Sequence, residues 1–242
     1  MLCLMTERRM GKNKFISFLN TSISKKEKQL AILIDPDVFD NSEAAYFLNK
    51  LPAQTTHLFV GGSTVEKDKT EATVIALKKY CSLPVFLFPG DESQITQSAD
   101  GILFLSLISG RNPEYLIEQQ VKSVSKLRDS SLEIMPTGYL LIEGGNKSAV
   151  ERVSETKPIS QDDIQTIVDT ALAGEYLGMK LIYLEAGSGA KNPVNTNIIS
   201  AVKEAINIPL FVGGGIKNEM QKKEAYAAGA DLVVMGTFFE NK

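Results

Sequence analysis

The sequence is poor in the residues that build disulfide frameworks and metal clusters. Its 242 residues include two cysteines, one histidine and no tryptophan. Cys3 and Cys81 are far apart and outside any metal or redox spacing, so we expect a protein of the reducing cytoplasm. His57 begins an apolar segment and has no second histidine with which to share a metal. We interpret it as a packed residue.

Long hydrophobic runs and an excess of positive charge are also missing. No segment approaches the roughly 20 apolar residues that a membrane span requires, and the N-terminus lacks the apolar stretch of a signal peptide. The formal net charge is -3 and the pI is about 5.4. These values argue against a duplex nucleic-acid binder. We expect a soluble protein that binds small molecules and further copies of itself, with peripheral membrane contact left open.

Apolar segments alternate with segments of helical spacing along the chain. Continuous apolar runs are typical of strands buried on both faces of a parallel sheet. With no linker composition between them, we expect a single (β/α)8 TIM-barrel domain over residues 1–242, with a doubly wound open sheet as the alternative. The apolar runs are 30–35, 56–61, 84–88, 101–106, 132–141, 180–185, 209–213 and 231–236, and helical spacing recurs at 65–80, 113–127, 162–178, 195–206 and 217–229.

Four segments depart from the regular alternation. Residues 91–99, after the third apolar run, are too short and polar for a full helix, so we expect a loop or a single turn there. Residues 143–160 have the composition of a polar excursion, and the few residues after position 236 predict a short C-terminal helix. An amphipathic stretch at about 12–28 predicts an N-terminal helical extension that covers the barrel.

Glycines, hydroxyls and acids gather where the predicted strands end, which is the active face of such a barrel. The glycine-rich turn at 213–215 and the Gly-Thr turn at 236–237 allow backbone N–H groups to approach a phosphate after the last two strands. Asp35 and Ser63 follow the first two strands, and their hard oxygen atoms suit Mg²⁺. The alternative for Asp35 is a capping or turn aspartate.

Five motifs resemble those of the geranylgeranylglyceryl phosphate synthase family, relatives of the bacterial heptaprenylglyceryl phosphate synthases. They are LIDPD (33–37), VGGST (60–64), YLEAGSG (183–189), VGGGI (212–216) and MGTFFE (235–240). The resemblance implies a prenyltransferase that joins a prenyl diphosphate, such as geranylgeranyl diphosphate, to the 3-hydroxyl of sn-glycerol 1-phosphate. The products would be an ether lipid precursor and pyrophosphate, and the enzyme would be a homo-oligomer.

The same resemblance implies roles for individual residues. Asp35 and Ser63 would hold the Mg²⁺ that binds the prenyl diphosphate. From its position beside Ser188 and Gly189, and not from the resemblance, we expect Glu185 to be the base that takes the proton of the glycerol hydroxyl, or alternatively an acceptor that only orients it. The residues implied for glycerol 1-phosphate are Tyr183, Leu184, Glu185, Ala186, Gly187, Ser188, Gly189, Gly214, Gly215, Gly236 and Thr237.

Two features differ from some members of that family. Leu33 stands where some members carry a lysine, and the YLEAGSG loop is one residue longer than YLEYSG, which places the chain nearer the larger group. Lys147, Arg152 and Lys157 are interpreted as solvated residues of the polar excursion. A phosphosugar isomerase or aldolase-type barrel and a phosphate-binding scaffold without activity are the alternative functions.

Overall fold

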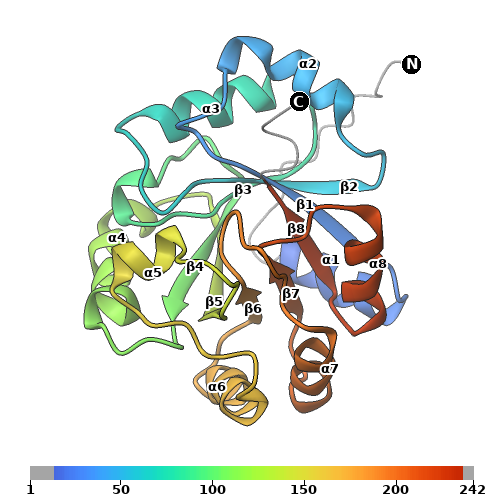
Figure 1. The fold of residues 1–242 in the computed structure, drawn as a ribbon. Helices are drawn as coiled ribbons and strands as arrows, with labels where there is room; N and C mark the ends of the chain where they lie inside the picture. Colours follow the sequence, from blue (N-terminus) through green and yellow to red (C-terminus); the bar gives the residue numbers. More distant parts are fainter. Residues whose placement is uncertain (1–13, 237–242) are drawn as a thin grey trace.

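Eight parallel strands form a closed barrel in chain order, as predicted (Figure 1). The computed structural model describes residues 14–236. Each predicted apolar run overlaps one strand, and because the sheet is closed the open-sheet alternative is wrong. The strands are β1 (Gln29–Ile34), β2 (Thr55–Val60), β3 (Val85–Leu87), β4 (Gly101–Leu107), β5 (Glu133–Leu141), β6 (Leu181–Glu185), β7 (Leu210–Gly213) and β8 (Leu232–Met235).

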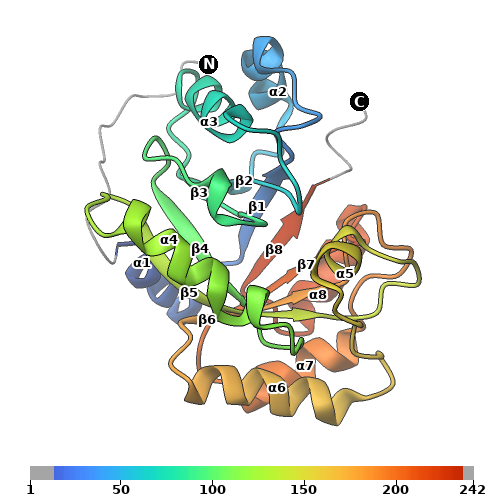
Figure 2. The same ribbon diagram turned by 90° about the vertical axis from the view of Figure 1, so that its left-hand side faces the viewer.

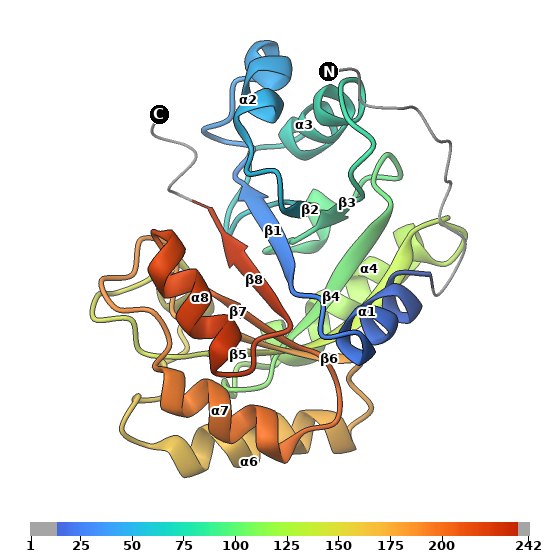
Figure 3. The same ribbon diagram turned by 90° about the vertical axis from the view of Figure 1, so that its right-hand side faces the viewer.

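Helices surround the barrel, with α2 and α3 on one side and α6 and α7 on the opposite side (Figures 2 and 3). The five segments of helical spacing all contain helix. The helical elements are α1 (Lys14–Ser24), η1 (Asn41–Glu43), α2 (Ala44–Lys50), α3 (Lys69–Lys78), η2 (Glu92–Gln94), η3 (Glu114–Glu118), α4 (Gln119–Leu127), α5 (Ala149–Ser154), α6 (Ile164–Tyr176), α7 (Thr196–Ala205) and α8 (Glu219–Ala227).

The sequence analysis missed two helices, α2 and α5. The second lies inside residues 143–160, so this segment is not simply a polar excursion. Its signal is a capping box: the Ser148 hydroxyl accepts a hydrogen bond from the Glu151 N–H at 3.0 Å. Lys147, Arg152 and Lys157 are exposed, in agreement with their interpretation as solvated residues. The predicted short C-terminal helix lies outside the described residues.

The pleat of each strand divides the core into two layers. On β6, Tyr183 points into the barrel, where it packs with Phe59 and Phe211. Leu184, the next residue, points outward into the layer between the sheet and the helices. This alternation decides which residues of a strand end can reach the barrel interior.

Helix α1 closes the end of the barrel where the strands begin. Phe15 is fully buried, and its ring lies 4.7 Å from the His57 ring and 4.1 Å from the Phe86 ring, measured between centroids. Burial lowers the pKa of His57 to about 3, so the packed interpretation of this histidine is confirmed. The Glu133 carboxylate on β5 accepts hydrogen bonds from the Phe15 and Ile16 N–H groups at 2.8–3.1 Å. A carboxylate at this position satisfies free N–H groups of the first turn and interacts favourably with the helix dipole.

The barrel wall is incomplete between β3 and β4. Strand β3 has three residues, and it pairs with β4 only at Phe86–Gly101 and Leu87–Ile102. Strand β4 continues to Leu107, beyond the end of its neighbour. Only the short turn η2 follows β3, as predicted from residues 91–99. The upper part of the wall therefore has a gap at this position.

We predict that Glu133→Ala lowers the free energy of unfolding by about 2–3 kcal/mol, because charge-assisted hydrogen bonds at a helix end are lost in a buried place. Urea denaturation measures this loss, and hydrogen exchange should show faster exchange for the amides of α1. Glu204→Ala, on the exposed face of α7, is the control and should change stability by less than about 0.5 kcal/mol. Equal stability of the two variants would contradict the proposed capping.

Candidate active site

A central cavity of about 650 Å³ opens at the carboxyl ends of the strands. It contains most of the residues predicted from the sequence, drawn from β1, β2, β6, β7 and β8. Two of them, Asp35 and Glu185, are carboxylates. The predicted residues that line it are Asp35, Ser63, Tyr183, Glu185, Ser188, Gly189, Gly214, Gly215 and Gly236.

The remaining predicted residues do not line this cavity. Leu184 and Ala186 are buried in the outer core layer, because the pleat directs them toward the helices. Gly187 packs against Ser148 and serves the site through its backbone. Contacts from the side chains of Leu184 and Ala186 to a substrate are therefore not expected. Thr237 lies outside the described residues.

The Glu185 carboxylate is the most deeply buried acid of the cavity, with 5% of the residue exposed. Its Oε1 atom accepts a hydrogen bond of 2.7 Å from the Gly187 N–H, so the turn that follows the strand anchors it. Burial raises its pKa to about 7, while the Gly187 N–H and the neighbouring Tyr183 hydroxyl oppose the shift. A carboxylate with this pKa is a competent proton acceptor near neutral pH.

The glycines after β7 leave room for this carboxylate and for Tyr183. A Cβ atom on Gly213 would lie 2.2 Å from the Tyr183 hydroxyl, and one on Gly214 would lie 2.3 Å from Glu185 Oε1. Gly214 also has a φ of +79°, which side chains other than glycine rarely adopt. The glycine-rich turn thus has a packing role in addition to any phosphate binding.

The Tyr183 hydroxyl is buried beside Glu185, yet it makes no hydrogen bond of regular geometry within residues 14–236. Burial, with the nearby Glu185 charge as a smaller cause, raises its pKa well above the ordinary value. The phenol therefore stays protonated and can donate a hydrogen bond to a ligand oxygen.

Asp35 is half-buried and follows directly after β1. Its Oδ1 atom accepts a hydrogen bond of 2.9 Å from the Asp37 N–H, which is the turn geometry considered as an alternative from the sequence. Burial, together with the Asp37 charge, raises its pKa, whereas a nearby cation would relieve this cost. A Cβ on Gly62 would lie 3.4 Å from both carboxylate oxygens, so the chain packs a glycine directly against them.

These residues fit a Mg²⁺ ion that takes few ligands from the protein. Asp35 and Ser63 offer hard oxygen atoms at one rim of the cavity. The described part of the chain contains no cluster of three or more His, Cys, Asp or Glu residues that could hold a metal alone. Mg²⁺ commonly completes such a shell with water and substrate phosphates.

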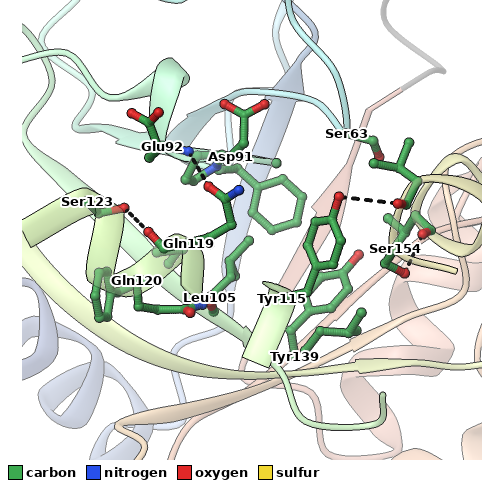
Figure 4. Close-up of a pocket in the computed structure, with 18 of the residues that line it drawn as sticks. Ser63, Asp91, Glu92, Leu105, Tyr115, Gln119, Gln120, Ser123, Tyr139 and Ser154 are labelled. Atoms are coloured by element: carbon green, nitrogen blue, oxygen red, sulfur yellow. Dashed lines mark hydrogen bonds between the residues drawn. The ribbon is translucent and has the colours of Figure 1, made fainter. Parts of the chain in front are cut away.

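A narrow apolar slot leaves the cavity through the gap between β3 and β4 and runs beneath α4. Figure 4 shows Ser63 and Ser154 on one side of it and Gln120 and Ser123 on the opposite side. The Tyr115 hydroxyl donates a hydrogen bond of 3.2 Å to the Val153 carbonyl, which ties η3 to α5 over the slot. Five residues line both spaces and define their junction: Gly62, Ser63, Phe88, Tyr139 and Val150.

Sequence reasoning missed several of the residues that line the cavity. Lys217 is the only cationic residue among those that the structure places in its wall. Its signal was its position directly after the GGGI turn. Lys191, in the loop after β6, is exposed and does not line the cavity. Val150 belongs to the unexpected helix α5, and Tyr139 could not be told from a core residue.

We predict that Gly214→Ala costs about 3 kcal/mol or more of stability, because the methyl group collides with Glu185 and the backbone conformation is strained. Gly189→Ala is the matched comparison: its φ is also positive, +69°, but nothing lies within 4 Å of its added Cβ. This second variant should lose only about 1 kcal/mol. Chemical denaturation of both variants decides the matter, and equal losses would mean that Glu185 moves aside freely.

Comparison with known proteins gives consistent matches over almost the whole chain. The model of the PcrB family matches residues 22–242. A geranylgeranylglyceryl phosphate synthase from Zunongwangia profunda is 61% identical over 215 residues, which cover 89% of this chain and 92% of that protein. One from Thermococcus gammatolerans is 41% identical over 218 residues, which cover 89% of this chain and 86% of the relative.

Solved structures agree with these sequence matches. The crystal structure of (S)-3-O-geranylgeranylglyceryl phosphate synthase from Thermoplasma acidophilum in complex with its substrate sn-glycerol-1-phosphate has a TM-score of 0.84 and 34% identity, covering 93% of this chain and 92% of that one. Because the family match and the relatives both extend over most of its length, the chain belongs to the PcrB family, together with these geranylgeranylglyceryl phosphate synthases.

Proposed function

We propose that the chain is a prenyltransferase that joins a prenyl diphosphate, such as geranylgeranyl diphosphate, to the 3-hydroxyl of sn-glycerol 1-phosphate. The observation that carries this proposal is that the central cavity and the slot are joined and differ in their lining. A cavity that contains two carboxylates and a glycine-rich rim opens into an apolar slot. Such a pair suits a small phosphorylated alcohol and a long hydrocarbon chain that meet at one point.

Glycerol 1-phosphate binds on the side of β6, β7 and β8. The backbone N–H groups of Gly214, Gly215 and Gly236, with Ser188, surround its phosphate, as is common after the last two strands of such barrels. Lys217 adds a positive charge on the same rim. The phosphate thereby anchors the molecule with its 3-hydroxyl toward Glu185.

Glu185 takes the proton of that hydroxyl while the oxygen attacks. A glycerol hydroxyl is a weak nucleophile until a base shares its proton, and a carboxylate with a pKa of about 7 is able to do so. The Tyr183 hydroxyl, buried next to it, can donate a hydrogen bond to an adjacent glycerol oxygen. The new bond joins this oxygen to the first carbon of the prenyl group.

The prenyl diphosphate lies with its tail in the slot and its diphosphate at Asp35 and Ser63. The slot is bordered by carbon-rich side chains such as Phe104 and Leu105, which bury the isoprenoid chain. Asp35 and Ser63 would hold Mg²⁺, and a bound Mg²⁺ would supply charge neutralisation to the diphosphate leaving group. Asp35 and Ser63 thus hold the diphosphate end while the slot aligns the chain.

The slot also distinguishes this function from the alternatives. A phosphosugar isomerase or aldolase needs the phosphate rim but has no use for a continuous apolar channel. A scaffold without activity would not require a buried carboxylate fitted by Gly213 and Gly214, whose added side chains would collide with it or with Tyr183. The relatives and their names favour the transferase as well.

We further propose a cytoplasmic homo-oligomer that makes peripheral contact with membranes. No helix within residues 14–236 is long and apolar enough to cross a membrane. The lipid product nevertheless has to reach a bilayer. Exposed apolar residues cluster beside α4, near the slot, and suit a covered or membrane-facing surface: Ile117, Val121, Val124 and Ile134.

The direct test incubates the purified chain with Mg²⁺, radiolabelled sn-glycerol 1-phosphate and prenyl diphosphates of different lengths, followed by lipid extraction. We expect label to enter the organic phase with one preferred chain length. If all label stays in the aqueous phase with every diphosphate while glycerol 1-phosphate still binds, the result would contradict the transferase and favour the isomerase or scaffold function.

Replacing Glu185 by glutamine should lower kcat by at least about 100-fold with a small change in the KM for glycerol 1-phosphate, because the amide cannot accept the proton. In the parent protein, kcat/KM should rise with pH through about 7 and then level off, because only the ionised carboxylate acts as a base. The substrate phosphate itself titrates near pH 6. The dependence of kcat/KM on pH is therefore also measured for the residual activity of Glu185→Gln. If kcat/KM of this variant still rises near pH 7, Glu185 is not the base.

Removal of divalent metal with a chelator should abolish transfer, and added Mg²⁺ should restore it. Asp35→Asn should raise the Mg²⁺ concentration needed for half-maximal activity by about tenfold or more, because a charged ligand is lost. Asp37→Asn is the matched control, since Asp37 pairs with Lys69 at 3.3 Å and does not line the cavity. Activity assays over a range of Mg²⁺ concentrations make this comparison, and equal metal requirements for the two variants would count against the proposed site.

A further inference from the structure

Two aromatic rings stand at the junction of the cavity and the slot. Phe88, one residue beyond the end of β3, and Tyr139 on β5 are the aromatic residues that line both spaces. Tyr139 is 5% exposed, so its ring is held in the wall and does not swing freely into solvent. Figure 4 shows the Tyr139 ring in the slot wall, below Ser63 in the view.

A third ring supports these two from the barrel interior. The Tyr183 ring stacks on Phe88 at 5.3 Å and on Tyr139 at 5.4 Å, and the centroids of Phe88 and Tyr139 are 6.0 Å apart. Tyr183 itself is completely buried. Because each ring contacts the other two, the positions of Phe88 and Tyr139 are set before any substrate arrives.

The junction is also where the reacting carbon of a prenyl diphosphate has to lie, if the proposed function holds. This carbon is bonded to the diphosphate on one side and to the hydrocarbon tail on the other. With the diphosphate at Asp35 and Ser63 and the tail in the slot, the carbon falls between polar and apolar surroundings. Its neighbours there are Phe88, Tyr139 and Val150.

Positive charge develops on this carbon during transfer. The bond to the diphosphate oxygen breaks with its electron pair going to the diphosphate, and the glycerol oxygen forms the new bond while its proton goes to Glu185. When bond breaking runs ahead of bond making, the allylic group carries positive charge. The face of an aromatic ring is negative and attracts such a charge, more strongly where water is excluded.

We propose that Phe88 and Tyr139 are catalytic residues that direct their ring faces at the allylic carbon and stabilise its developing positive charge. This inference rests on the proposed function. Carboxylates would be poor substitutes at the same place, because a carboxylate could be alkylated by the carbon and would repel the diphosphate. The rings provide attraction without nucleophilic reactivity and keep water from the carbon.

The first experiment compares Tyr139→Phe with Tyr139→Leu in the full chain. The phenylalanine variant keeps the ring and should keep kcat within about twofold. The leucine variant should lose about 10- to 30-fold in kcat, in line with the strength of a desolvated cation–π contact, while both KM values change little. Phe104→Leu, which removes a ring of the slot outside the junction, should act mainly on the KM for the prenyl diphosphate. Denaturation midpoints and calorimetric binding of glycerol 1-phosphate check that each variant is folded.

The second experiment changes the charge on a ring face with little change in its shape. Phe88 is replaced by mono-, di- and trifluorophenylalanine, which withdraw electron density from the face in steps. We expect log kcat to fall in proportion to the number of fluorine atoms, a result that a packing role would not give. Constant kcat along this series, or a Tyr139→Phe loss as large as that of Tyr139→Leu, would overturn the proposal. An absence of transfer by the parent protein would instead refute the proposed function.

Discussion

Burial of the Glu185 carboxylate is the constraint around which the loops of the upper barrel are arranged. A carboxylate in this position needs a hydrogen-bond donor and space, and the chain provides both with glycine. The donor is the N–H of Gly187, and the space exists because Gly213 and Gly214 have no side chains. Gly144, from the loop after β5, packs so closely that a Cβ there would lie 2.1 Å from the Ala186 carbonyl oxygen. Three loops therefore meet around the proposed base, which makes its orientation a property of the fold and not of a mobile side chain.

The short strand β3 has the opposite effect, since it removes structure where the barrel would otherwise be sealed. A complete wall would separate the barrel interior from the space under α4. Because β3 ends at Leu87 and only η2 follows, the two spaces join, and Phe88 comes to lie at their boundary. The lower barrel compensates for this opening: Phe15 of α1 fills its end and packs on Phe86, so the gap does not extend through the molecule.

Features of this protein that depend on residues close together in the sequence could be predicted, whereas those that depend on contacts between distant segments could not. Strands and most helices follow from local periodicity, which is why all eight apolar runs became strands of the barrel. A contiguous motif such as YLEAGSG does not show which of its residues point into the barrel and which point outward. Leu184 was therefore grouped with Tyr183, although the two side chains lie in different core layers. Helix α5 was missed because it has only six residues and lies in a polar segment, where its capping box is its clearest signal.

Other features depend on contacts between distant segments and could not be seen in the sequence. Phe86 and Phe88 belong to the same apolar run, 84–88, and the sequence does not distinguish them. Phe86 packs on Phe15 of α1, whereas Phe88 lies at the junction, just beyond the early end of β3. The role of Tyr139 depends on its contacts with the rings of Phe88 and Tyr183, which are far from it in the sequence. The pKa of Glu185 likewise depends on burial by several elements, so a glutamate at a strand end does not reveal it.

The separation of the cavity that contains the two carboxylates from the apolar slot also bears on why the proposed reaction would form an ether and not simply hydrolyse the diphosphate. Water is far more abundant than glycerol 1-phosphate, and an allylic carbon with positive charge reacts with either oxygen nucleophile. Selectivity therefore requires that the carbon be screened from water while one hydroxyl is admitted. Phe88, Tyr139 and Val150 place carbon at the junction, whereas Glu185, beside which the glycerol hydroxyl would be held, lines only the cavity. Anchoring of the phosphate on the far rim would then make the glycerol oxygen the nucleophile present at high effective concentration, and the proposed base would activate that oxygen alone.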